Sequence, residues 1–270
     1  GGIGNLAKTL ADWIVGNGGN VLYRQEVTEI VMRNGRAAAV STNKGITVAA
    51  DRLLANLTPW ALVKLLGDDA PSRWHQPVKT MPATWGAFTV YLGLDEGKLP
   101  SSIPDHHQVI VDPEKPLGET NSVFISLSDS IDGQRAPEGM RAAILSTHTA
   151  VAPWWQLQQT DRDAYEVRRE QYAERMVAAA ERAIPGIGQA IRLCLPGTPV
   201  TFQRFTRRPQ GMVGGFAQES LFRAHGPATG IPNLWLVGDS IFPGQSTAGV
   251  TVGGMRVATA VIHHAGKRGR

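Results

Sequence analysis

The 270-residue sequence has a single cysteine, Cys194, and little charge of either sign in excess. One cysteine excludes a disulfide framework and a structural metal site built on cysteines, so we expect Cys194 to be a small buried hydrophobic residue. No apolar run approaches the roughly 18 residues of a membrane span. The formal net charge of +4 is too small for a nucleic-acid-binding charge field. With a hydrophobic fraction of 42%, the composition is that of a globular chain with a real core.

The first 60 residues predict a helix, a hairpin and a strand. Apolar residues recur at helical spacing from Leu6 to Ile14, and a glycine cluster follows. Two short strands, 27–32 and 37–42, are joined at Asn34-Gly35, which is a strong hairpin signal. A further strand is predicted over 52–56, ending near Pro59.

The middle of the chain predicts a sheet followed by a long helix. The apolar segment 85–94 is typical of a strand covered on both faces. Further strands are predicted at 122–128, 141–149 and 198–205, with a helix over 161–184 and a glycine-bearing loop over 209–215.

The C-terminal segment carries the strongest functional signal. A buried strand over 234–237 ends in Gly238-Asp239, which places a carboxylate at the sheet edge where open α/β sheets bind ligands. A carboxylate there is suited to accept hydrogen bonds from polyol hydroxyls. The helix predicted over 247–264 directs free backbone N–H groups at the same crevice. Its internal glycines, Gly249, Gly253 and Gly254, indicate close approach of a strand or a flat ring. A tightly packed core helix is the alternative interpretation.

Segment 234–260 resembles the C-terminal FAD-binding motif of the phytoene desaturase family, which also contains carotenoid isomerases. The resemblance extends over most of the chain. It implies an α/β, Rossmann-like flavoprotein fold of the glutathione-reductase or amine-oxidase type, with an α+β substrate domain. It divides the chain into FAD-domain segments 1–62 and 231–270 around a substrate domain over 63–230.

The same resemblance implies which residues face the cofactor, FAD. Val27 would contact adenine, and Asn56 lies where a strand end returns to the cofactor. Gly238 and Asp239 would hold the ribityl chain. The pyrimidine end of the flavin would be lined by Gly244, Gln245, Thr247 and Ala248.

The phosphate-binding part of the family's FAD site has no convincing counterpart. Gly2-Ile3-Gly4-Asn5-Leu6-Ala7 matches GxGxxA, and Glu26 follows at a suitable distance. The motif requires a preceding strand, however, and no residues precede the first glycine here. We therefore expect the chain to be the C-terminal portion of a longer enzyme that lacks the phosphate-binding βαβ unit.

Other residues have a functional and a structural interpretation. Trp85, Phe88 and Tyr91 could line an apolar tunnel for a polyene or belong to ordinary core. Arg207, Gly214 and Gly215 could shape the cavity that faces the flavin or form a solvated turn. No metal site is expected: His106-His107 and His263-His264 are adjacent pairs, and neighbouring residues of a helix or strand do not face one another.

The resemblance implies an FAD-dependent oxidoreductase that desaturates a carotenoid by hydride transfer to the flavin, with segment 119–149 favouring the 3′,4′-desaturase branch. A carotene isomerase using reduced FAD, an amine-oxidase-like flavoenzyme and a non-catalytic apo fragment remain alternatives. The expected partner is a hydrophobic polyene and not nucleic acid. A cytoplasmic location is expected, with peripheral membrane contact as an option. The sequence identifies no catalytic base and no oligomeric state.

Overall fold

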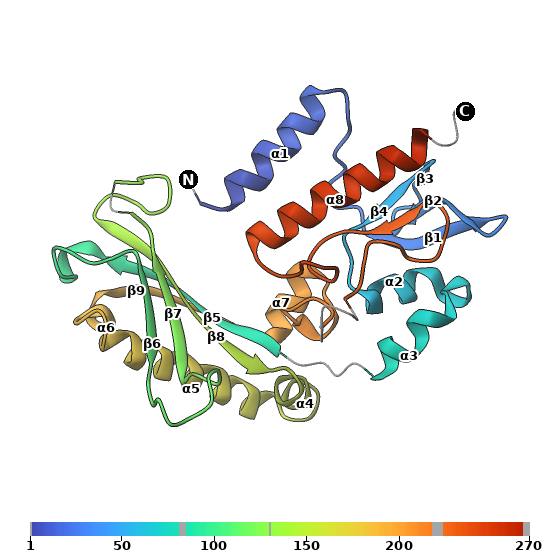
Figure 1. Ribbon diagram of the computed structural model, residues 1–270. Coiled ribbons are helices and arrows are strands. Elements are labelled where there is room, and N and C mark those ends of the chain that lie inside the picture. Colours follow the sequence, from blue (N-terminus) through green and yellow to red (C-terminus); the bar gives the residue numbers. More distant parts are fainter. Residues whose placement is uncertain (1, 81–84, 130, 218–223, 267–270) are drawn as a thin grey trace. The chain divides into compact units, whose positions relative to one another are not determined.

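The computed structural model describes residues 2–80, 85–129, 131–217 and 224–266, without the side chains of 264–266. The chain forms two compact units, Gly1–Val21 with Ala83–Val213 and Leu22–Pro82 with Gly214–Arg270. Each unit therefore combines segments that are distant in the sequence (Figure 1). No helix within the described residues is both long and apolar enough to cross a membrane.

The first unit is built on a five-stranded antiparallel sheet in the order β6-β7-β8-β5-β9. Its strands are β5 Trp85–Asp95, β6 His106–Ile110, β7 Ser122–Leu127, β8 Met140–Ala150 and β9 Ile191–Gly197. Its helices are α1 Gly4–Gly16, α4 Ala152–Thr160, α5 Arg162–Glu181, α6 Ile187–Ala190 and α7 Pro199–Thr206, with short 3₁₀ turns η2 Glu96–Lys98 and η3 Pro209–Gly211. Helix α5 runs along one face of the sheet (Figure 1).

Strand β5 has one buried face and one open face. Phe88, Val90, Leu92 and Leu94 alternate into the core, where they pack with residues of α4 and α5 such as Trp154 and Met176. Tyr91, on the other face, is 45% exposed. The prediction of cover on both faces is therefore wrong for the second face, because α4 and α5 pack on the opposite side of the sheet.

Segment 198–205 is a helix, α7, and not the predicted strand. The hydroxyl of Thr198 accepts a hydrogen bond from the backbone N–H of Thr201, and Pro199 occupies the first helical turn. Threonine at the N-cap followed by proline is a helix start, and it prevails over the strand propensity of the following residues. The strand lies one segment earlier, as β9, and its Cys194 is exposed, which corrects the expectation of a buried thiol.

The second unit contains two small sheets. Strands β1 Val27–Arg33, β2 Arg36–Thr42 and β3 Thr47–Ala49 form an antiparallel meander, and β4 Leu53–Ala55 pairs in parallel with β10 Leu234–Leu236. Helices α2 Pro59–Leu66, α3 Ser72–Thr80 and α8 Thr247–Gly266 and the turn η1 Gly67–Asp69 complete it. Asn34 and Gly35 adopt φ values of 51° and 70°, which confirms the predicted hairpin turn. Its core joins segments that are distant in the sequence, since Leu62, Leu236 and Val257 pack in one cluster.

Gly211 is expected to be indispensable for the first unit. Its φ of +70° disfavours any side chain, and an added Cβ would overlap the carbonyl of Pro199 at well under 3.0 Å. We expect Gly211→Ala to lower the free energy of unfolding by about 3 kcal/mol, measured by urea denaturation. Gly133→Ala is the matched control because no atom lies within 4 Å of its Cβ position. Equal unfolding midpoints for the two variants would contradict the backbone overlap.

Candidate functional site

The carboxyl ends of β4 and β10 bring two predicted site segments together. The strands are parallel, with Leu53 opposite Leu234 and Ala55 opposite Leu236, so the residues after both strands meet at one edge. Val237 extends the ladder by donating to the carbonyl of Ala55 over 3.0 Å. Gly238 has a φ of +109°, and a Cβ there would overlap the amide oxygen of Asn56. Asn56 and Gly238 are therefore adjacent, and a side chain at position 238 would displace the Asn56 amide.

Asp239 lies against the predicted glycine loop. Its side chain is half-buried, directly after Gly238. A Cβ on Gly215 would come within 3.0 Å of the Asp239 carbonyl and of the Ser240 nitrogen, so the loop backbone rests on this segment. The N–H of Phe216 donates to the Ser240 hydroxyl over 3.2 Å, which holds the loop in place. The glycine at 215 is required by this close approach of two backbones.

The N-terminus of α8 completes the cluster. Ser246 is the N-cap, with its hydroxyl accepting from Gly249 N over 3.0 Å and its carbonyl accepting from Val250 N over 2.9 Å. Thr247 and Ala248 are exposed, and N–H groups in the first turn have no acceptor within the helix. Gln245 lies beside the glycine loop, since a Cβ on Gly214 would be 2.8 Å from its amide nitrogen.

Of the three α8 glycines singled out in the sequence, Gly249, Gly253 and Gly254, only Gly249 is crowded by described residues. A Cβ on Gly249 would lie 2.7 Å from the carbonyl of Gly244, which confirms a close backbone approach there. The corresponding position on Gly253 is 3.8 Å from Pro243, and that on Gly254 has no atom within 4 Å. Close packing against the described residues therefore does not explain Gly253 or Gly254.

This cluster offers the donor and acceptor set that a flavin requires. The Asp239 carboxylate and the Asn56 amide can accept hydrogen bonds from a chain of hydroxyls, as in a ribityl group. The exposed N–H groups of Thr247 and Ala248, with the Gln245 amide, can donate to ring carbonyls. The residues present fit the flavin half of FAD.

The predicted adenine contact lies elsewhere, and so does the GxGxxA match. Val27 is in the other sheet of the second unit, at the first position of β1, half-buried and opposite Thr42. The GxGxxA match runs from Gly2 into α1 of the first unit, and no strand precedes it among the described residues.

The predicted substrate residues divide between the two faces of the first unit's sheet. Trp85 and Tyr91 lie on the open face. Phe88 is fully buried on the opposite face, with its ring 5.4 Å from that of Trp154. Arg207 is an exposed residue with a φ of 59° at the C-terminus of α7.

A polar network that the sequence did not reveal holds the loop beside Trp85. The Glu119 carboxylate accepts from Thr149 Oγ1 over 3.0 Å, from Ala150 N over 2.6 Å and from the Tyr172 hydroxyl. Burial raises the pKa of Tyr172, and its hydrogen bond to Glu119 raises it further, so the phenol stays protonated and donates. Gly118 lies beside the Trp85 ring, since a Cβ added to this glycine would be 3.5 Å from a ring carbon of Trp85. Glu119 thereby positions the loop against which Trp85 rests.

Comparison with solved structures shows the class of fold. No family model matches the chain. An oxidoreductase from Methanosarcina mazei superposes with a TM-score of 0.64 at 21% identity, covering 93% of this chain and 53% of that one. Putrescine oxidase superposes with a TM-score of 0.56 at 12% identity, covering 88% and 48%. These likenesses confirm the predicted α/β flavoprotein fold of the amine-oxidase type.

The particular relatives are enzymes of carotenoid metabolism. Prolycopene isomerase of Daucus carota is 31% identical, covering 97% of this chain and 43% of the isomerase. The neurosporene-forming phytoene desaturase of Cereibacter sphaeroides is 29% identical, covering 93% and 51%. The chain is therefore homologous to carotenoid isomerases and desaturases, which confirms the resemblance seen in the sequence. It spans about half the length of these relatives.

Proposed function

We propose that the chain forms the flavin-facing part of an FAD site and the substrate-binding sheet of an oxidoreductase. The observation that carries the proposal is the convergence of Asn56, Asp239 and the first turn of α8 at one sheet edge. Bound flavin would supply the hydride acceptor or, when reduced, the hydride donor. The chain's own groups bind and orient it: Asp239 and Asn56 on the ribityl chain, Gln245, Thr247 and Ala248 on the ring.

The proposed substrate is a carotenoid. Its support is the identity of the homologues, together with the open face of the first unit's sheet. Tyr91, Phe124, Leu193 and Leu195 there are all more than 40% exposed. Apolar groups gathered in this way mark a binding surface for an apolar partner. A polyene without polar groups binds by burial, at about 25 cal/mol per Å².

Desaturation, including the 3′,4′-branch, and isomerisation remain two candidate reactions on this one site. The relatives include a desaturase at 29% identity and an isomerase at 31% identity. A desaturase consumes an electron acceptor in proportion to product, whereas an isomerase requires reduced flavin and shows no net redox change. Anaerobic turnover with dithionite-reduced FAD distinguishes them: product formed without an acceptor supports the isomerase.

The flavin proposal is tested by titrating FAD into the purified chain and recording the visible spectrum. The proposal places the pyrophosphate-binding part of the site in the portion of the relatives that this chain does not match. We therefore expect weak retention by the chain alone and stoichiometric flavin bands once that portion of a relative is supplied. Absence of flavin in the combined protein would favour the apo-fragment alternative. Peroxide formation from an amine would favour an amine-oxidase-like enzyme.

The open sheet face is tested by Tyr91→Asp. A carboxylate at this exposed position would have to be desolvated against a hydrocarbon, so we expect carotenoid binding to weaken at least about ten-fold. The affinity is measured by transferring a carotenoid from detergent to the protein and recording the shift of its absorption bands. Tyr23→Asp, at a more exposed tyrosine of the second unit, is the control. Equal loss in both variants would remove the open face from the substrate site.

We also propose a cytoplasmic location with peripheral contact to the membrane that carries the substrate. Its support is the apolar substrate class together with the exposed apolar face described above. Fractionation of cells that express the chain, with and without a high-salt wash, tests this location.

A further inference from the structure

A pocket lies at the end of the β4/β10 sheet opposite the cofactor cluster. It encloses about 380 Å³, within the range of small-molecule sites. Its lining comes from the β1–β2 hairpin end, the end of β3 and the segments before β4 and β10: Arg33, Asn34, Arg36, Ala37, Ala38, Ala49, Ala50, Asp51 and Asn233. Asp51 precedes β4 and Asn56 follows it, so about five residues of extended chain, roughly 17 Å, separate the two sites.

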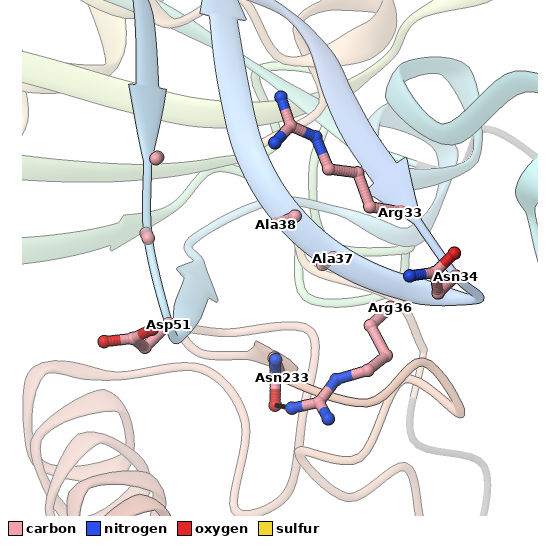
Figure 2. Close-up of a pocket in the computed structure, with 9 residues that line it drawn as sticks. Arg33, Asn34, Arg36, Ala37, Ala38, Asp51 and Asn233 are labelled. Atoms are coloured by element: carbon pink, nitrogen blue, oxygen red, sulfur yellow. Dashed lines mark hydrogen bonds between the residues drawn. The ribbon is translucent and has the colours of Figure 1, made fainter.

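The pocket holds an unusual arrangement of charge (Figure 2). Arg33 and Arg36 are paired across the hairpin by their backbones, and Figure 2 shows their side chains extending in opposite directions from it. The side chains of Arg33 and Asp51 make no hydrogen bond or ion pair with any described residue. The pocket is thus lined by two cations, one carboxylate and four alanines, and among these described residues no ion pair joins the cations to the carboxylate.

Arg36 is oriented by a buried partner. Its guanidinium donates to Asn233 Oδ1 over 2.9 Å, and Figure 2 shows this bond at the pocket wall. Asn233 is buried, and its carbonyl accepts from Leu53 N over 2.7 Å, which fixes it to β4. The remaining guanidinium N–H groups of Arg36 are therefore held in place and are available to an anion.

We propose that this pocket binds an organic phosphate that also carries hydroxyl or ammonium groups. The phosphate would accept hydrogen bonds from the oriented guanidinium of Arg36, and Arg33 would add a second positive charge to the pocket lining. Guanidinium groups are preferred partners of phosphate. The hydroxyl or ammonium groups would donate to Asp51. The site is independent of the flavin proposal, since no residue is shared. A free phosphate ester and a glycerophospholipid headgroup present the same chemistry.

The test titrates two soluble probes, glycerol 3-phosphate and inorganic phosphate, into the full chain and measures binding by calorimetry. We expect saturable binding of glycerol 3-phosphate, weakened about ten-fold or more by R33Q/R36Q. K44Q/K64Q removes the same charge from exposed positions of the same unit and should change affinity less than two-fold. D51N should strengthen inorganic phosphate binding and reduce the preference for the ester.

Vesicle flotation separates the two sources of the ligand. Flotation on phosphatidylglycerol but not phosphatidylcholine vesicles, lost in R33Q/R36Q and retained in K44Q/K64Q, supports a headgroup. Saturable binding of the soluble ester without flotation supports a free ester. The proposal is overturned if neither probe binds, or if R33Q/R36Q and K44Q/K64Q weaken binding equally. Because the Arg33 side chain makes no hydrogen bond or ion pair with any described residue, R33Q alone repeats the test in a variant whose folding should be unaffected.

Discussion

Asp239→Ala is expected to weaken FAD binding by about ten- to a hundred-fold. Hydrogen bonds from ribityl hydroxyls to a half-buried carboxylate contribute about 1.5–3 kcal/mol, and alanine removes the acceptor. The measurement is an FAD titration, by absorbance, of the chain extended with the part of its relatives that it does not span. Asp239→Asn keeps an acceptor oxygen and should recover part of the loss.

Asp68→Ala is the control, because it removes an exposed carboxylate from η1 in the same unit. Unchanged flavin affinity in Asp239→Ala would show that this residue does not hold the ribityl chain. Urea unfolding of each variant separates loss of cofactor from loss of fold.

Gly215→Ala is expected to lower the free energy of unfolding of the second unit by about 3 kcal/mol and to abolish flavin binding. Its Cβ would overlap the Asp239 carbonyl and the Ser240 nitrogen, which are backbone atoms and cannot rotate away as a side-chain tip would. Either the glycine loop or the Asp239 segment must move, and both belong to the cofactor cluster. Thermal melts and FAD titration measure the two effects.

The matched control is Gly226→Ala, where no atom lies within 4 Å of the added methyl group. A Gly215→Ala protein with normal stability but no flavin would place the effect in the site alone. Normal stability together with normal flavin binding would refute the close contact between the loop and Asp239.

Local signals in the sequence were sufficient for several elements. The Asn34-Gly35 dipeptide specified the hairpin turn, because both residues tolerate positive φ. The strand before Gly238-Asp239 and the helix after it followed from hydrophobic pattern and glycine placement. Helices α2, α3 and α4 and strands β3 and β6 were not predicted; they are three to nine residues long, which is too short for a clear period.

Side chains alternate between the two faces of a strand, and the sequence did not show which face is covered by helices. The predicted substrate residues could therefore not be divided into buried and exposed ones from the sequence. Trp85, Phe88 and Tyr91 have equal aromatic character, but which face α5 covers is a property of packing. Thr198 is a related case: its helix cap was present in the sequence, and the strand propensity of 198–205 obscured it.

By itself, the sequence determined the carboxylate after a buried strand and the helix that follows, because each depends on neighbouring residues. Its resemblance to the phytoene desaturase family indicated the flavoprotein fold. Only the tertiary structure decided which distant groups meet: Asn56 with Gly238, Gly215 with Asp239, and Glu119 with Tyr172. It also brought Arg33 and Arg36 into one pocket with Asp51. The physical reason is that these contacts join segments whose spacing along the chain carries no periodic signal, so only packing of the sheets brings them together.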